Sequence, residues 1–137
     1  MASSSDPASP PGELLFTLPI PTTSSGTITC TSPAAKVYLL TFNSPPDNRL
    51  TTSFCATLLL ALDILEHQHP LGVVVTTSAI KKFYSNGLDL QHAFSTKDFM
   101  INSLYPVFRR FLTYAEPYTL LPIQLLTITA TPCRLWL

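Results

Sequence analysis

The strongest constraint on the fold is a long helical pattern that leads directly into a β-branched run. Apolar residues recur at helical spacing over residues 54–68, and Thr52 or Ser53 is suited to cap the start of this helix. Pro70 ends the pattern, and the run 71–76 is typical of a strand buried on both faces of a parallel sheet. The sequence therefore predicts one long helix followed at once by one buried strand.

Two β-rich runs precede this helix and predict a hairpin. They cover residues 27–31 and 36–42, and the turn-forming stretch 43–48 ends the second run. Strand, helix and strand in this order form a β-α-β unit, so we expect an α/β fold. A further helix is predicted over residues 97–113, with a bend at Pro106.

Composition divides the chain into three parts. Residues 1–25 are rich in Ser, Pro and Thr and bury too little apolar surface to offset ordering, so we expect a loose arm in which only 14–16 docks locally. Residues 26–114 carry the predicted elements and form the domain. Residues 115–137 hold no sustained helical or alternating period, because prolines interrupt every apolar run, and they are predicted to form a separate tail.

Charge and hydropathy exclude several classes of function. The chain has 8 Lys+Arg against 8 Asp+Glu, so it lacks the positive charge on which nucleic-acid binding depends. Only 12% of its residues are charged and 46% are hydrophobic, a composition that favours self-association. The nearest approach to a membrane span, residues 118–126, is broken by a proline and a glutamine. We therefore expect neither a nucleic-acid partner nor a membrane span.

The cysteines and histidines do not predict a metal site. Cys30, Cys55 and Cys133 are widely spaced, which indicates neither a disulfide framework nor a zinc site and favours an intracellular protein. His67 and His69 are two residues apart and do not share a helix face, so we interpret them as surface histidines. The remaining polar candidates are interpreted as structural or solvated: His92, Asp63, Glu66, Arg109, Arg110 and Glu116.

The backbone of residues 81–90 is suited to bind a ligand. Ser85, Asn86 and Gly87 follow the predicted buried strand and indicate a sharp turn, and Asp89 is placed to cap the next helix. Parallel sheets bind ligands at the carboxyl ends of their strands, and backbone amides at a helix start can hold an anion. We therefore expect the functional site within residues 81–90.

The run 82–90, KFYSNGLDL, resembles the first oxyanion-hole motif of the crotonase (enoyl-CoA hydratase/isomerase) superfamily. Over roughly residues 14–114, the order of the elements is similar to the fungal and plant peroxisomal enoyl-CoA isomerases. The resemblance implies an incomplete crotonase-like fold, an acyl-CoA or enoyl-CoA thioester as substrate without a separate cofactor, and a homo-oligomer. It also implies a peroxisomal location, although residues 134–137 do not match a Ser-Lys-Leu address.

The same resemblance assigns roles to individual residues. The backbone N–H of Leu88 would be one of two donors that polarise the thioester carbonyl, and its side chain would be dispensable. The residues beside the CoA moiety would be Ser85, Asn86, Gly87 and Asp89. The candidates for contact with the CoA phosphates are Lys36, Lys81 and Lys82.

The tail departs from the family. Residues 115–137 contain no glycine, and neither the second oxyanion element nor the catalytic glutamate of the family has a counterpart there. We therefore expect a truncated, inactive relative of the isomerases that shift the enoyl-CoA double bond from position 3 to position 2 in fatty-acid β-oxidation. The alternative is a non-catalytic acyl-CoA-binding or interaction fragment that associates with full-length relatives. Either way, strand 71–76 is expected to have an unpaired edge.

Overall fold

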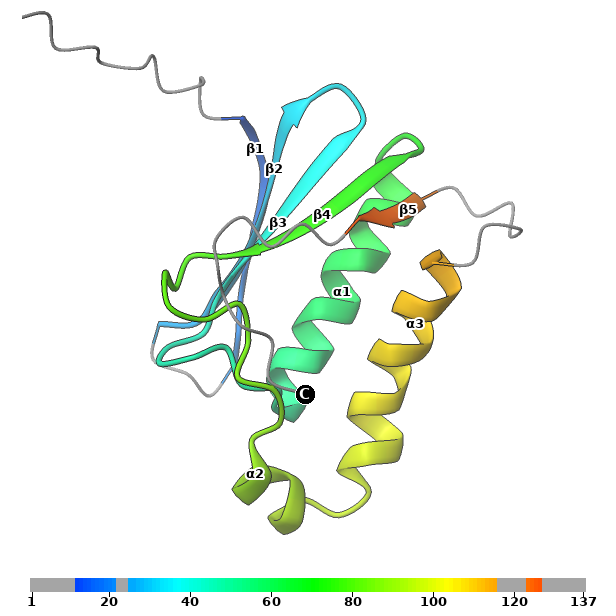
Figure 1. The fold of residues 1–137 in the computed structure, drawn as a ribbon. Coiled ribbons are helices and arrows are strands. Elements are labelled where there is room, and N and C mark those ends of the chain that lie inside the picture. Colours follow the sequence, from blue (N-terminus) through cyan, green and yellow to red (C-terminus); the bar gives the residue numbers. More distant parts are fainter. Residues whose placement is uncertain (1–11, 22–24, 116–122, 127–137) are drawn as a thin grey trace, which may run out of the picture.

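The computed structural model describes residues 12–21, 25–115 and 123–126, and Figure 1 shows one mixed β-sheet with helices packed against it. The strands are β1 (Glu13–Pro19), β2 (Thr27–Ala34), β3 (Val37–Asn43), β4 (Gly72–Ser78) and β5 (Ile123–Leu126). The helices are α1 (Thr52–Gln68), α2 (Leu90–Ser95) and α3 (Tyr105–Ala115), and the π-helical turn η1 (Met100–Leu104) leads into α3. The predicted α/β class is confirmed.

The sheet has the strand order β1-β2-β3-β4-β5. β1, β2 and β3 are antiparallel neighbours, whereas β3, β4 and β5 run parallel. The helix α1 connects β3 to β4, so the predicted β-α-β unit is present with the predicted elements. Its cap is Thr51 rather than Thr52 or Ser53, because the Thr51 Oγ1 accepts the Phe54 N–H over 3.2 Å.

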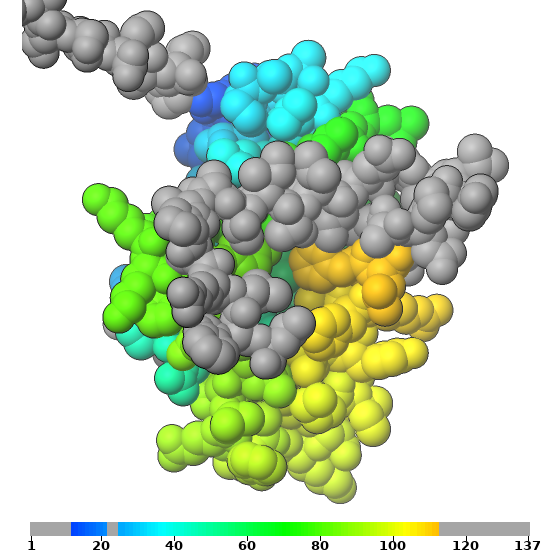
Figure 2. Space-filling view, in the orientation of Figure 1, coloured from blue at the N-terminus to red at the C-terminus, as the bar shows by residue number. Residues whose placement is uncertain are grey.

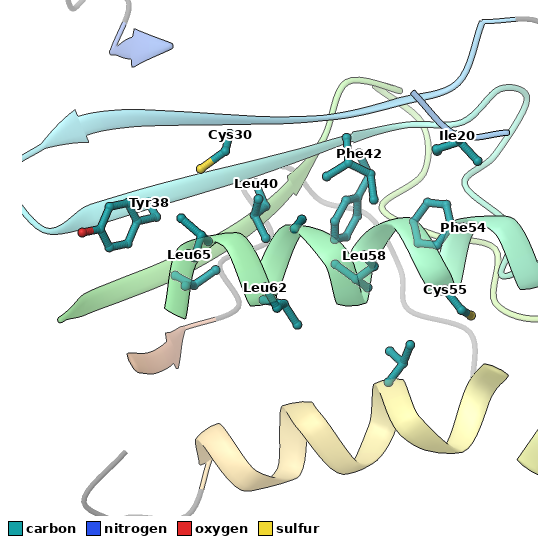
Figure 3. Packing of buried hydrophobic residues seen from close by; sticks show 14 of the residues in the cluster. Ile20, Cys30, Tyr38, Leu40, Phe42, Phe54, Cys55, Leu58, Leu62 and Leu65 are labelled. Carbon is teal, nitrogen blue, oxygen red and sulfur yellow. The ribbon is translucent and has the colours of Figure 1, made fainter. Parts of the chain in front are cut away.

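The core lies between the sheet and α1 (Figure 3). Alternate residues of the central strands face α1, which meets them with one apolar stripe. Phe42 and Phe54 pack edge to face, with ring centroids 5.4 Å apart. Leu40 and Leu62 are completely buried, and each such side chain stabilises the fold by about 1.5–3 kcal/mol. Helix α3 lies alongside α1 (Figures 1 and 3).

The expectation of a loose arm up to residue 25 is wrong for residues 13–19. These residues form β1, which pairs with β2 along its length. The physical reason is a short alternation: Phe16 pairs with Cys30 and Leu18 with Ile28, so both side chains pack against the core. Residues 1–11 and 22–24 of that arm lie outside the described residues.

Two expectations about β4 need correction. Val74 and Thr76 are buried, but Val73 and Val75 on the opposite face are only half-buried, so the strand is not buried on both faces. The edge of β4 is not unpaired either, because β5 pairs with it in parallel from Gly72 to Val75. The prediction of a tail without regular period therefore fails at Ile123–Leu126, where four residues, one of them Gln124, are too few for a period to indicate a strand.

The helix predicted over 97–113 is present in a different form. η1 precedes α3, and at its end the Tyr105 N–H donates to the carbonyl of Met100, five residues earlier. Pro106 is the second residue of α3 and has no N–H to donate to the preceding turn, which belongs to η1. The predicted bend is thus replaced by a wide π-helical turn before the proline.

Candidate functional site

The candidate site lies where β3 and β4 end at the same edge of the sheet. The turn after β3 and the loop after β4 meet there, and Asn48 joins them from a fully buried position. Its Oδ1 accepts the Ser44 N–H over 2.7 Å, and its Nδ2 donates to the Ser78 Oγ over 2.8 Å and to the Tyr84 carbonyl over 2.9 Å. The acceptor bond closes the turn after β3, and the two donor bonds join this turn to Ser78 and Tyr84.

Asn48 also requires an unusual backbone conformation. Its φ is 52°, in the left-handed region that asparagine tolerates better than most residues. Its own carbonyl accepts the Ser85 hydroxyl over 2.7 Å, and the same hydroxyl oxygen accepts the Gly87 N–H over 3.1 Å. The predicted CoA neighbour Ser85 is therefore engaged in shaping the loop.

Asn86 is tied to the same turn. Its N–H donates to the Asp47 carbonyl over 2.9 Å, and its Nδ2 donates to the Asp47 Oδ2 over 3.0 Å. The Asp47 carboxylate, which is buried, also accepts from the Arg49 Nε over 3.0 Å. Gly87 follows with φ of 74°, which supplies the sharp turn that the sequence predicted.

The backbone of Leu88 is positioned by a parallel bridge to Leu50. The Leu50 N–H donates to the Gly87 carbonyl over 2.8 Å, and the Asp89 N–H donates to the Leu50 carbonyl over 3.3 Å. In a parallel bridge of this kind, the N–H of the central residue points away from the partner strand. No acceptor for the Leu88 N–H occurs among the described residues.

Asp89 caps α2, as the sequence predicts. Its Oδ1 accepts the His92 N–H over 3.0 Å. The His92 ring then reaches the start of α1, where its Nε2 accepts the Thr52 N–H over 3.1 Å and lies 2.8 Å from the Thr52 Oγ1. The structural interpretation of His92 is confirmed, because the ring links α2 to α1.

An apolar pocket of about 140 Å³ borders this loop. Leu50, the bridge partner of Leu88, lines it, and so does Ser85. The other lining residues come from the sheet, α1, η1 and α3: Phe42, Phe54, Leu58, Tyr84, Leu104, Val107, Phe108 and Phe111. No carboxylate is among these lining residues.

Tyr84 forms the polar end of the pocket wall. Its hydroxyl lies 2.7 Å from the Thr76 Oγ1, and its ring packs on Phe42 with centroids 5.8 Å apart. Burial raises the pKa of the Tyr84 phenol, and the hydrogen bond with Thr76 partly opposes that shift. The phenol is therefore a neutral hydrogen-bonding group at physiological pH.

The three lysines predicted to contact the CoA phosphates lie in two different parts of the fold. Lys36 precedes β3, and its carbonyl accepts the N–H of Val73 near the start of β4. Seven residues of β3 at about 3.3 Å each separate Lys36 by about 23 Å from the far end of that strand, where the loop after β4 lies. Lys81 and Lys82 are exposed in the loop itself, and the Lys82 Nζ lies 5.5 Å from the centroid of the Phe83 ring. The structure thus brings Lys81 and Lys82, and not Lys36, to residues 85–89.

The expectation that Arg109 and Arg110 form a solvated pair is wrong for Arg110. It donates to Asp63 over 2.7 Å and also to Glu66, so it links α3 to α1. Both acids are thus engaged in ion pairs with Arg110. Glu116 lies outside the described residues.

The described histidines and acids do not assemble a metal site. The His67 Nδ1 lies 2.8 Å from the carbonyl of Asp63, and the His69 ring packs against Tyr38. Within residues 12–21, 25–115 and 123–126, no three His, Cys, Asp or Glu side chains are grouped so that they could hold a metal ion. None of the helices in this part of the chain is long and apolar enough to cross a membrane.

Sequence reasoning missed Asn48 and Asp47, which hold the loop. Both lie in the turn-forming stretch 43–48, and an asparagine in such a stretch is a candidate for a left-handed backbone. That signal points to a turn but not to the segment about 40 residues away that the side chains contact.

No protein-family model matches the chain, and no curated protein or solved structure gives a significant match.

Proposed function

We propose that this chain binds acyl-CoA thioesters as a relative of the crotonase-type enoyl-CoA isomerases and does not turn them over. The observation that carries the proposal is the Leu88 N–H, which is held by the bridge to Leu50 and has no acceptor among the described residues. In the proposed complex this N–H donates to the thioester oxygen. The motif 82–90 supports the same assignment through its resemblance to the family.

The surroundings of Leu88 suit the rest of such a ligand. The apolar pocket beside Leu50 and Ser85 is suited to take part of the acyl chain, because its lining is dominated by aliphatic and aromatic side chains. Lys81 and Lys82 lie in the same loop and supply positive charge for the CoA phosphates. Ser85, Asn86 and Asp89 act as positioning residues, since their side chains bond to the protein.

We infer binding without turnover because no base and no second N–H donor accompany the Leu88 N–H in the described pocket. Moving the double bond of an enoyl thioester requires a base that removes one proton and returns it elsewhere, and geometry is the first requirement for such a base. The described pocket wall offers no carboxylate, and a single N–H donor gives only part of the stabilisation that an enolate requires.

The test is titration of the full chain with octanoyl-CoA, with free CoA and octanoate as separate arms. Leu88→Ala keeps the N–H and is expected to retain binding, whereas Leu88→Pro removes it and is expected to weaken binding about tenfold. Leu90→Pro is the matched control, because Leu90 is the first residue of α2, where proline is tolerated.

Three outcomes would contradict the proposal. Equal affinity for octanoyl-CoA and free CoA would remove the role of the thioester and the acyl chain. Equal effects of Leu88→Ala and Leu88→Pro would remove the role of the N–H. Isomerisation of a 3-enoyl-CoA above the uncatalysed rate would show that the chain does turn over substrate.

A further inference from the structure

Helix α3 and the turn η1 present a row of large apolar side chains to solvent. Ile101, Tyr105, Phe108 and Leu112 are 68%, 62%, 53% and 66% exposed. They are spaced by four, three and four residues, which is the alternating interval of a helix-packing seam. Figure 2 shows this part of the chain, in yellow and orange, at the surface of the molecule. We call these four residues the α3 seam.

The seam is not the face that α3 buries in its own domain. Leu104 and Val107 are buried against the core, and Arg110 is tied to α1 through Asp63 and Glu66. The contacts of α3 within the domain are therefore made by a different side of the helix. The exposed seam has no structural role within the described residues.

The seam contains a concave surface that suits a side chain from outside. A groove of about 390 Å³ lies between Met100, Ile101, Leu104, Tyr105 and Phe108, and all five residues are apolar or aromatic. A groove of this kind on a helix is the shape that receives a side chain of a facing helix.

The spacing of the seam is self-complementary. Ile101 and Leu112 are equidistant in sequence from the junction between Pro106 and Val107, and so are Tyr105 and Phe108. An antiparallel two-fold pairing about that junction therefore places Ile101 opposite Leu112 of a second copy. It likewise places Tyr105 opposite Phe108, so every position of the seam meets another seam position.

The exposed area is sufficient for a specific interface. The four side chains of the seam together with Met100 present roughly 600 Å² per copy, taking about 200 Å² for a large side chain. Two copies would bury about 1,200 Å², the lower end of the range for specific interfaces. The seam carries no charge, and the chain has a formal net charge of zero, so no electrostatic repulsion opposes the pairing.

We propose that two copies of this chain associate through antiparallel packing of the α3 seam. Leu112 of each copy inserts into the groove beside Ile101 of the other, and Tyr105 packs against Phe108 around the two-fold axis. Phe108 belongs both to the seam and to the apolar pocket beside Leu50, but Ile101 and Leu112 do not line that pocket. Variants of these two residues therefore test the pairing separately from acyl-CoA binding.

The experiment is sedimentation equilibrium of the full chain across protein concentration. We expect a monomer–dimer equilibrium in which Ile101→Lys and Leu112→Glu each weaken dimerisation about tenfold or more. The double variant Ile101→Lys/Leu112→Glu is expected to recover dimerisation, because the antiparallel register places each lysine opposite a glutamate. Leu71→Glu is the control, since Leu71 is 56% exposed but lies outside the seam.

Thermal unfolding of each variant separates weakened dimerisation from failure to fold. A chain that stays monomeric at high concentration would overturn the proposal. Association that responds equally to Leu71→Glu and Leu112→Glu would also overturn it and indicate unspecific aggregation. Loss of association in both single variants without recovery in the double variant would exclude the antiparallel register and indicate a different occupant of the seam.

Discussion

The Asn48 Nδ2 donates to the backbone carbonyl of Tyr84 over 2.9 Å, and the two residues lie in segments that follow different strands. Asn48 belongs to the turn after β3, whereas Tyr84 belongs to the loop after β4. Through this bond the position of residues 84–88 depends on the turn at 43–48. The Leu88 N–H is therefore held by tertiary contacts rather than by the local sequence of its own loop.

Replacing Asn48 tests this dependence. Asn48→Ala leaves the buried Ser44 N–H without an acceptor and places alanine at φ of 52°, so we expect a loss of about 3 kcal/mol in the free energy of unfolding. Asn48→Gly loses the same side-chain hydrogen bonds but adopts φ of 52° without strain, so it should be about 1 kcal/mol less destabilising than Asn48→Ala. Urea unfolding measures both, with the exposed Asn102→Ala as control. Similar stabilities for wild type and Asn48→Ala would show that the network is dispensable.

Two glycines should respond differently to substitution. A Cβ on Gly72 would lie 2.2 Å from the Lys36 carbonyl oxygen, so Gly72→Ala forces the β3–β4 pair apart and should cost about 1–3 kcal/mol. Gly87 has free space around its Cβ position but a φ of 74°, so Gly87→Ala should cost about 1–2 kcal/mol.

Asparagine distinguishes these two causes. Gly87→Asn should be milder than Gly87→Ala, because asparagine tolerates the left-handed region. Gly72→Asn should be worse than Gly72→Ala, because its larger side chain meets the same backbone. Chemical denaturation of the four variants gives the comparison, and the reverse order at either glycine would contradict the assigned cause.

Arg110 should stabilise the docking of α3 on α1. Arg110→Met keeps most of the aliphatic side chain but removes both ion pairs, so we expect a loss of about 1 kcal/mol. The stability difference between wild type and variant should shrink as salt is raised, since the pairs are partly exposed. Hydrogen exchange should locate faster exchange in α3. A difference independent of salt would assign the effect to packing instead.

The buried thiols predict a loss of stability at high pH. Burial raises the pKa of Cys30 to about 12 and that of Cys55 to about 11, from an ordinary value of 9.0. Above pH 9 the unfolded chain releases these protons while the folded chain retains them, so stability falls as pH rises from 9 towards 11–12. The slope is at most about 1.4 kcal/mol per pH unit for each thiol.

Denaturant titrations between pH 8 and 11 measure this slope. Cys55→Ala should reduce it, because one of the two buried thiols no longer contributes. Both thiols should also react slowly with iodoacetamide in the folded protein, since the thiolate is the reactive form. Stability that is constant from pH 8 to 11 would contradict the assignment.

Much of the candidate site was predictable, because its signals are local. Ser85, Asn86 and Gly87 indicate a turn by their types, and Asp89 caps α2 three residues before the N–H that it accepts. The bonds from these residues to Asp47, Asn48 and Leu50 were not predictable. They join segments nearly 40 residues apart, and no residue type specifies such a distant partner.

Local patterns were sufficient to predict α1, from its apolar stripe, and β4, from its β-branched run. The pairing of β1, the pairing of β5 and the ion pairs of Arg110 depend on the assembled fold. Strands of four to seven residues are marginal alone and form where a neighbouring edge offers hydrogen bonds. An arginine on a helix is solvated or paired according to what lies across from it, which for Arg110 is the pair Asp63 and Glu66 on α1. Both outcomes depend on contacts that exist only once the sheet and α1 have assembled.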